Sequence, residues 1–251
     1  MPQHPTSELK TALITGSSRG LGLTLADFLA AQGWALIITA RGEAALADAA
    51  RTLGRYGNPV HALPGDVTDP AHRRALAGLV GEGGGLNLLV NNASELGPSP
   101  LPALAEYPLT AFGSVYQTNV LAPLGLVQEA LGALRARRGL VVNISSDAAV
   151  GAYPGWGGYG ASKAALDLLT RTLAAELRDV GVVSVDPGDL RTQMHAEAFP
   201  GEDISDRPLP EVTLPFWAWL LGRDPLTVSG ARFQAQGERW ELPKGGAHEL
   251  A

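Results

Sequence analysis

Short runs of apolar residues alternate with longer amphipathic segments along most of the chain. We predict a strand at each short apolar run between turn residues, and a helix where apolar residues recur every three or four positions. Seven strands are predicted in this way, at residues 10–15, 34–40, 60–64, 86–90, 140–144, 182–186 and 229–234. Helices are predicted between them, the longest over residues 109–137 and 159–180.

The alternation of strands and helices continues without a long linker or an internal repeat. It predicts one α/β domain over residues 1–251, with a doubly wound parallel sheet of seven strands and helices on both faces, in three αβα layers. Two polar segments fall outside this pattern. Residues 190–212 are proline-marked and are expected to form a flexible substrate lid, and residues 243–251 are expected to be a loose tail.

Composition removes several classes of function. The 251 residues carry a net charge of −6 without a run of Lys or Arg, which argues against nucleic acid or a membrane surface as partner. Absence of cysteine excludes disulfides, cysteine-based zinc sites and a thiol nucleophile. The five histidines are scattered, so no metal site is expected. Because we find neither a signal-peptide pattern nor an apolar stretch of membrane-spanning length, we expect a cytoplasmic protein.

A glycine-rich turn, Gly16-Ser17-Ser18-Arg19-Gly20-Leu21-Gly22, joins the first predicted strand to the first predicted helix. Gly16 allows a tight turn, Gly20 lets the backbone approach a pyrophosphate, and Gly22 allows close packing of helix on strand. The free N–H groups of the helix then face the phosphates. The spacing is G-x-x-x-G-x-G, not the commonest G-x-G-x-x-G, and the competing interpretation is a plain loop.

The second predicted strand closes with Thr39-Ala40-Arg41, and no acidic residue follows until Glu43. At this position an acid favours NAD by accepting from the ribose 2′-OH, whereas an arginine matches the 2′-phosphate of NADP. Arg19 in the glycine turn offers a second cation, so NADP is predicted. The alternative is that Arg41 is only a solvated residue at the start of the next helix.

Tyr159 and Lys163 stand four residues apart near the start of a predicted helix and therefore share one face. A phenol has a pKa of about 10, and an ammonium one turn away lowers it towards working pH. The alternative is a solvated pair. Of the three lysines, only Lys163 lies far from a terminus. An apolar stripe along this helix is predicted at Ala161, Ala165, Leu168, Leu169, Leu173 and Leu177.

Other polar residues mark the predicted strand ends and helix interiors. Asn91 and Asn92 close the fourth strand, where their amides can fix a turn. Asn119 is predicted to perturb the long helix and to free a carbonyl for water. A bulky set could face a reacting centre and would suit an apolar or aromatic carbonyl compound, although ordinary packing explains each member equally well: Leu96, Tyr153, Trp156, Met194, Phe199 and Trp217. His195 and Asp189 are expected to be solvated.

From Thr11 to about Trp240 the chain resembles the short-chain dehydrogenase/reductase family, whose fold is a Rossmann-type sheet. The motifs that carry the resemblance are Thr15 to Gly22, Asp66-Val67, Asn91-Asn92-Ala93-Ser94, Asn119, Ser146, Tyr159 with Lys163, and Pro187-Gly188 followed by Thr192. Ser94 is a departure, because the family usually has glycine there.

The resemblance implies an NADP-dependent oxidoreductase that acts on a small carbonyl or alcohol substrate. It implies that Tyr159 is the general acid or base, and that Lys163 lowers the pKa of Tyr159 and binds the nicotinamide ribose. It also implies that Ser146 orients the substrate oxygen and that Asn119 holds a water. It implies cofactor contacts at Gly16, Ser18, Arg19, Gly20, Leu21, Gly22, Arg41, Asp66, Val67, Asn92, Ala93, Tyr159, Lys163, Pro187, Gly188 and Thr192. A homodimer or homotetramer is also implied.

Two other functions fit the same sequence. A redox sensor would bind NADP(H) on this fold without turnover, because fold alone does not prove chemistry. An isomerase or dehydratase would use NAD transiently, but Arg41 and the short C-terminal part count against it. The complete set of Asn119, Ser146, Tyr159 and Lys163 favours the enzyme over the sensor.

Overall fold

The computed structural model describes residues 9–242, which form one seven-stranded parallel sheet in the order β3-β2-β1-β4-β5-β6-β7. The strands are β1 Thr11–Thr15, β2 Ala35–Thr39, β3 Val60–Ala62, β4 Leu88–Asn91, β5 Leu140–Ile144, β6 Gly181–Asp186 and β7 Arg232–Gln234. Each overlaps its predicted range, so the predicted fold class is confirmed. The predicted tail at 243–251 lies outside the described residues.

The order of the strands places a crevice beside β1. Leu13 of β1 pairs with Ile37 of β2 on one side and with Leu89 of β4 on the other. The chain therefore winds outward from β1 in both directions, and loops at the carboxyl ends of β1 and β4 leave the sheet on opposite sides. Open α/β sheets bind ligands at this switch point.

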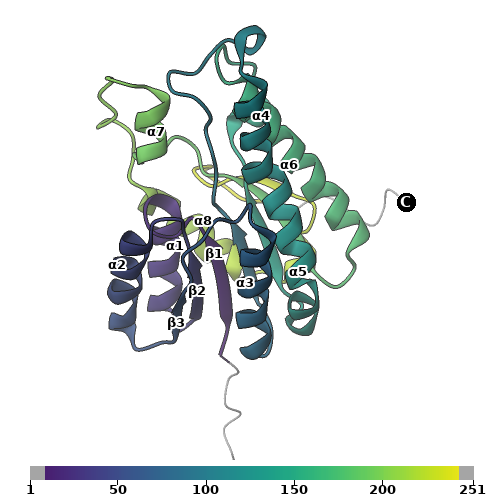
Figure 1. Ribbon diagram of the computed structural model, residues 1–251. Coiled ribbons are helices and arrows are strands. Elements are labelled where there is room, and N and C mark those ends of the chain that lie inside the picture. Colours follow the sequence, from purple (N-terminus) through teal and green to yellow (C-terminus); the bar gives the residue numbers. More distant parts are fainter. Residues whose placement is uncertain (1–8, 243–251) are drawn as a thin grey trace, which may run out of the picture.

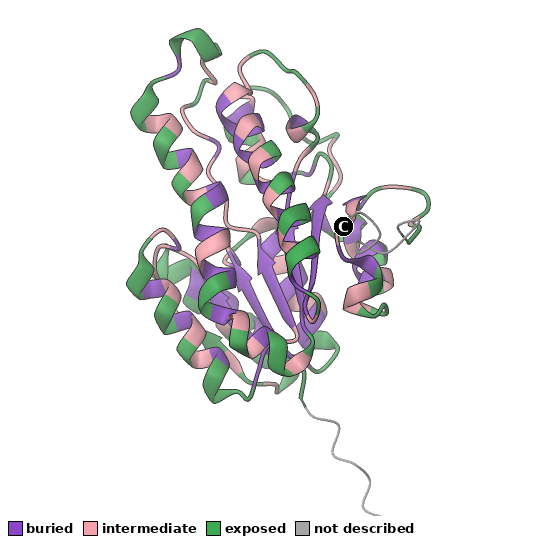
Figure 2. Ribbon diagram, turned by 90° about the vertical axis from the view of Figure 1, so that its right-hand side faces the viewer, coloured by how far each residue is buried: buried purple, intermediate pink, exposed green. Residues whose placement is uncertain are grey.

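The helices lie on both faces of the sheet (Figure 1). They are α1 Gly20–Ala31, α2 Glu43–Leu53, α3 Pro70–Glu82, α4 Leu109–Tyr116, α5 Ala122–Arg137, α6 Gly157–Glu176, α7 Gln193–Ala198, α8 Leu214–Leu221 and α9 Pro225–Val228. Figure 2 shows that the inner strands of the sheet are buried, while the helices expose their outer faces.

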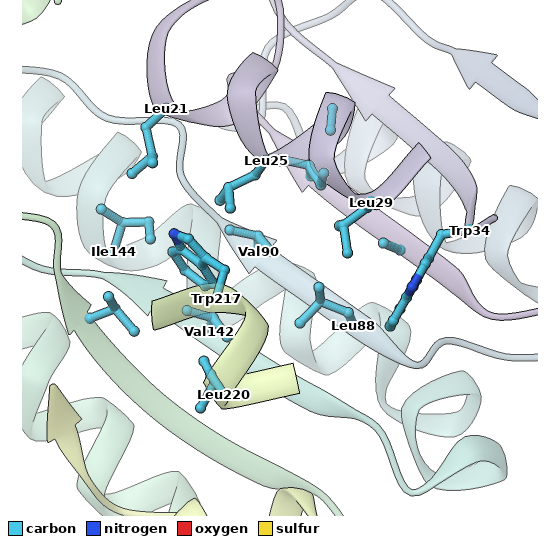
Figure 3. Close-up of a cluster of buried hydrophobic side chains, with 14 of the residues drawn as sticks. Leu21, Leu25, Leu29, Trp34, Leu88, Val90, Val142, Ile144, Trp217 and Leu220 are labelled. Atoms are coloured by element: carbon cyan, nitrogen blue, oxygen red, sulfur yellow. The ribbon is translucent and has the colours of Figure 1, made fainter. Parts of the chain in front are cut away.

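Successive residues of a strand enter different cores, as the alternation of side chains across a sheet requires. In β1, Ala12 and Ile14 belong to the cluster beneath α1, α2 and α8, whereas Leu13 belongs to the cluster beneath α3, α5 and α6. Figure 3 shows the first cluster, in which Leu25 of α1 lies near Val90, and Leu29 lies near Leu88 and Trp34. One core lies on each face of the sheet, so the sheet is the middle one of three layers.

Trp217 corrects one expectation about the substrate region. Its side chain is fully buried in the core beneath α8, and its indole N–H donates to the Thr213 hydroxyl at 3.1 Å. A tryptophan with a satisfied N–H and a large apolar body is stable in such a core. Trp217 therefore belongs to the core between α8 and the sheet and does not face the cleft.

The predicted helix 109–137 is divided. A π-helical segment, Gln117–Leu121, separates α4 from α5 and contains Asn119. Pro123 has no N–H to donate to the carbonyl of Asn119, its partner in a regular α-helix, and this explains where the helix widens. The prediction of a local perturbation at Asn119 is thus correct, and proline contributes to it.

The predicted apolar stripe of α6 is displaced. Leu168 is 57% exposed, while Ser162, Lys163 and Thr170 are buried. Polar side chains can face a core when each has a partner, and the hydroxyl of Thr170, for example, donates to the Leu166 carbonyl at 2.8 Å. The helix is oriented by its polar residues and ends at Glu176, earlier than predicted.

Within residues 9–242, every helix is too short or too polar to span a membrane.

Candidate active site

A cleft of about 780 Å³ opens at the carboxyl edge of the sheet. It receives residues from the turns that follow β1 to β6. Every residue predicted to bind cofactor or to take part in catalysis lines this cleft, except Gly22 and Asn119, which lie behind its wall. The sequence motifs therefore meet at one place, as their positions at strand ends indicate.

The glycine turn after β1 is packed too closely for side chains. A Cβ atom on Gly16 would stand 2.9 Å from the Cα of Ala93, and one on Gly22 would stand 2.5 Å from the Gly16 carbonyl oxygen. Gly16 also has a φ of +64°, in the region that favours glycine. Asn92 fixes the turn, because its amide donates to the carbonyls of Thr15 and Gly16 at 2.9 and 3.1 Å.

The N-terminus of α1 faces the cleft from this turn. The helix begins at Gly20, and no side chain caps its first N–H groups. Ser18, Arg19 and Leu21 line the cleft beside it. Free N–H groups at a helix start attract a phosphate, and the bare backbone of the turn leaves room for one. The residues present thus fit the pyrophosphate of a dinucleotide.

The next two strand ends supply the adenosine side of the cleft. Arg41 is exposed at the rim, while Asp66 and Val67 follow β3. Burial opposes the charge of Asp66, but bonds from the amide and hydroxyl of Thr68, together with Arg41, hold its pKa below the usual value. Asp66 is therefore a fixed carboxylate, and Arg41 faces it.

Asn119 is fully buried and makes four hydrogen bonds. Its side-chain oxygen accepts from the Glu95 N–H at 2.7 Å and the Ser94 hydroxyl at 3.1 Å. Its amide donates to the Glu95 carbonyl and to the Ser162 hydroxyl, both at 2.9 Å. Asn119 therefore joins the loop after β4 to α6, behind the wall of the cleft.

Tyr159 and Lys163 lie one turn apart on the buried face of α6. The Lys163 ammonium donates to the Ile144 carbonyl at 2.7 Å and lies 5.4 Å from the centre of the Tyr159 ring. The Ser146 hydroxyl donates to Asp147 at 3.0 Å and accepts from the Ala148 N–H at 3.2 Å. All three predicted groups line the same wall of the cleft.

The acidity of this pair differs from expectation. Burial raises the pKa of Tyr159 above its usual value, although hydrogen bonds with the hydroxyls of Ser94 and Ser146 act in the opposite direction. Burial also lowers the pKa of Lys163 to about 8, while Asp167 opposes this shift. The predicted lowering of the phenol pKa is therefore wrong for this structure, because removal from water outweighs the neighbouring groups.

The segment after β6 closes the opposite side of the cleft. Pro187, Gly188 and Thr192 line it, and the Thr192 hydroxyl caps α7 by accepting from the His195 N–H at 3.3 Å. The predicted lid, residues 190–212, contains α7 and touches the glycine turn, because Arg19 donates to the side chain of Gln193. The lid therefore lies directly beside the phosphate turn.

An apolar wall stands beside Tyr159. Leu96, Trp156 and Met194 line the cleft and pack with Phe199 and the Tyr159 ring. Tyr153, in contrast, is 47% exposed and does not line the cleft. Three of the six bulky residues suggested from the sequence thus border the site.

The sequence interpretation missed several polar residues of the site. Asp186 lines the cleft and is the last residue of β6, so the rule that ligands bind at strand ends would have identified it. Glu95 also lines the cleft and accepts from the hydroxyls of Ser114 and Thr118. His195, expected to be solvated, has a side chain only 10% exposed.

In the part of the chain that the structure describes, no cluster of three or more acidic, histidine or cysteine side chains is arranged to hold a metal ion.

Comparisons with known proteins identify the family of the chain. A family model described as short chain dehydrogenase matches residues 10–203. The rhamnolipids biosynthesis 3-oxoacyl-[acyl-carrier-protein] reductase of Pseudomonas aeruginosa is 38% identical over 202 residues, which cover 76% of this chain and 77% of that protein.

Two solved structures share the fold over nearly the whole chain. A short chain dehydrogenase from Shigella flexneri 2a, complexed with NADP, has a TM-score of 0.84 and 29% identity, covering 92% of this chain and 99% of that one. Another from Escherichia coli CFT073, complexed with NADPH, has a TM-score of 0.83 and 29% identity, covering 93% and 100%.

Proposed function

The chain belongs to the short-chain dehydrogenase family, and we propose that it is an NADPH-dependent oxidoreductase that reduces a small carbonyl compound, with Tyr159 as general acid. The observation that carries the proposal is the joint position of Tyr159, Lys163 and Ser146 on one wall of a cleft whose other end is a bare phosphate turn. The apolar wall beside Tyr159 suits the body of an apolar or aromatic substrate.

The protein would supply orientation and a proton, while the bound nicotinamide supplies the hydride. Tyr159 donates the proton from its phenolic oxygen to the substrate oxygen, and Ser146 orients that oxygen by a hydrogen bond. A raised pKa keeps the phenol protonated at neutral pH, which is the form that carbonyl reduction needs. The reverse reaction would need the phenolate.

Lys163 would hold the nicotinamide ribose and return a proton to the site. Its pKa of about 8 lets the ammonium form and the amine form exchange near neutral pH. Asn119, at the π-helical segment, would hold the water that links Lys163 to bulk solvent, as predicted from the sequence. The other cofactor contacts stay as predicted, with Arg19 and Arg41 at the 2′-phosphate.

The direct test is NADPH oxidation against a panel of aldehydes, ketones and quinones, with Tyr159→Phe and the matched variant Tyr153→Phe. We expect Tyr159→Phe to abolish turnover, because the acid is lost, and to leave NADPH affinity nearly intact. Tyr153→Phe should keep activity, since Tyr153 lies outside the cleft. Full activity of Tyr159→Phe would remove the assigned role.

A non-catalytic NADP(H) sensor is the second candidate. It is favoured by the hydrogen bond that the Ser146 hydroxyl already donates to Asp147, because that hydrogen must turn towards the substrate oxygen for catalysis. Fluorescence titration separates the two: tight NADPH binding without turnover of any carbonyl in the panel would favour the sensor. The homodimer or homotetramer remains a prediction that light scattering can check.

A further inference from the structure

Arg232, at the start of β7, joins three separate parts of the catalytic wall. Its Nε donates to Asp167 of α6 at 3.0 Å, and its Nη2 donates to Asp186 of β6 at 3.2 Å and to the Ser146 carbonyl at 2.8 Å. The side chains of Asp167 and Asp186 are 11% and 4% exposed. A guanidinium donates in fixed directions within one plane, so it determines how these three groups lie relative to one another.

Each of the three partners is adjacent to a proposed catalytic group. Asp167 lies one helical turn beyond Lys163 on the buried face of α6. Asp186 lines the cleft, and its other carboxylate oxygen accepts from the Gly188 N–H at 3.0 Å. The Ser146 carbonyl belongs to the residue whose hydroxyl would orient the substrate. Taking the proposed function as given, we propose that Arg232 is a positioning residue that holds the Ser146 peptide and offsets the charges of Asp167 and Asp186 beside Tyr159 and Lys163.

The carboxylates around Tyr159 and Lys163 determine in which direction loss of Arg232 would shift the pKa of each group. Asp167 faces Lys163 from the same helix and raises its pKa, while Asp186 and Asp147 face Tyr159 from β6 and the turn after β5 and raise the pKa of that ring. One oxygen of Asp167 is buried and has no hydrogen-bond partner among residues 9–242. Without Arg232, the field of Asp167 on Lys163 and that of Asp186 on Tyr159 would both grow.

A purely structural tie is the competing interpretation. β7 has only three residues and lies at the edge of the sheet, so an ion pair to α6 would also help to hold it. Such a tie predicts lost stability on substitution but unchanged ionisation of Lys163. The two interpretations therefore differ in a quantity that can be measured without substrate.

The test is a pH titration of the protein labelled with ¹³C at the lysine Cε, followed by NMR. The chain has three lysines, so the Lys163 signal can be assigned by its loss in Lys163→Arg. We expect a native midpoint near 8. It should rise by about half a unit or more in Arg232→Gln and fall by a similar amount in Asp167→Asn, because one change unmasks a nearby carboxylate and the other removes it.

The matched control is Arg135→Gln, which breaks a half-exposed pair with Asp179 far from the cleft and should leave the midpoint unchanged. Arg232→Lys keeps the charge but cannot make all three bonds, so its midpoint should stay near the native one. If Arg232→Gln does not fold, Arg232→Lys still tests positioning, because it keeps the charge but loses the three-way contact, so its kcat should fall below the native value while its midpoint stays near the native one. Unchanged Lys163 midpoints in both Arg232→Gln and Asp167→Asn would overturn the proposal.

Kinetics provide a second readout. With a carbonyl substrate from the panel, Arg232→Gln should lower kcat about 10- to 100-fold with little change in the KM for NADPH, because a displaced Ser146 impairs orientation and not cofactor binding. Arg232→Lys should recover part of this loss. Equal kcat in native protein and Arg232→Gln would contradict positioning. Absence of any turnover by the native protein would refute the proposed function, while the NMR result would stand on its own.

Discussion

The turn after β1 and the helix α6 both line the cleft, but the turn presents glycine backbone and free N–H groups, whereas α6 presents polar side chains. At the turn, glycines leave no room for a Cβ, and N–H groups face the cavity. On α6 the groups that face inward are the phenol of Tyr159 and the ammonium of Lys163, which the helix removes from water. The proposed phosphate binding would thus depend on shape, whereas the wall formed by Tyr159 and Lys163 depends on buried polar partners.

The two designs have different costs. Each glycine of the turn loses more conformational entropy on folding than another residue would, whereas a buried polar group requires a partner. Behind α6 these partners form a chain: the Asn91 amide donates to Asn143, and the Asn143 amide donates to the Thr170 hydroxyl, both at 2.8 Å. Substitutions on the α6 side should therefore change stability with pH, and those in the turn should not.

The largest effect is expected from Lys163→Met. Since the pKa of Lys163 is about 8 in the folded protein and 10.5 as its model value, the folded state binds fewer protons between these pH values. The cost of burying the ammonium is fully present below about pH 8 and is lost above about pH 10.5, so native stability gains about 3 kcal/mol across this window. The variant lacks that gain.

Urea denaturation of native protein and Lys163→Met at pH 7 and at higher pH checks this. As the pH rises, the unfolding free energy of the native protein should increase relative to that of Lys163→Met. Lys10→Met is the matched control, because Lys10 is exposed and its substitution removes no buried charge. A difference that is independent of pH would show that folding does not lower the pKa of Lys163.

Gly22→Ala tests the turn. Its Cβ would lie 2.5 Å from the Gly16 carbonyl oxygen and 2.6 Å from the Asn92 amide nitrogen, so the backbone must shift at a cost of about 1–3 kcal/mol. We expect weaker NADPH binding by fluorescence titration, with the loss of affinity the same at pH 6 and pH 9. Gly78→Ala, at an exposed position of α3 with open space around it, should slightly stabilise the protein and leave binding intact.

The same contrast explains what the sequence allowed us to predict. The glycine turn was predictable because each glycine acts through local geometry: Gly16 needs its positive φ, and Gly22 needs close approach. The five inner strands were predictable because their apolar runs are buried on both faces. Local rules of this kind require no knowledge of partners distant in the chain.

The catalytic wall was less predictable because its partners are distant. Periodicity placed the buried stripe of α6 on leucines, but Ser162 is buried by its bond to Asn119, 43 positions away. The expected lowering of the Tyr159 pKa was wrong because the degree of burial is a property of the whole fold. Trp217 could not be placed from composition, since an aromatic residue suits a core as well as a substrate wall.

Arg41→Asp tests the end of the cleft proposed to bind the adenosine. There a side chain, and not the backbone, would select NADPH over NADH. The native protein should bind NADPH about 10-fold or more tightly than NADH, because a 2′-phosphate gains a charge-assisted contact. The variant should lose this preference, since its carboxylate repels the phosphate and can accept from a ribose 2′-OH. Equal affinities of the native protein for NADPH and NADH in fluorescence titration would refute the arginine argument.

The smallest effect is expected at Ser94, where the family usually has glycine. Its hydroxyl donates to Asn119 at 3.1 Å, and when its one hydrogen turns to the phenolate of Tyr159 instead, the hydrogen bond lowers the pKa of that ring. Loss of the hydroxyl should raise the pKa further, so the pH midpoint of alcohol oxidation, which needs the phenolate, should move upward. Below that midpoint, oxidation should slow by about 2- to 5-fold, the value of one neutral hydrogen bond.

Ser94→Gly and Ser94→Ala form a matched pair, because both lose the hydroxyl and only alanine keeps the Cβ. Equal shifts in the two variants would assign the effect to the hydroxyl, whereas a native profile in Ser94→Ala would mean that the departure from glycine is only a matter of the backbone.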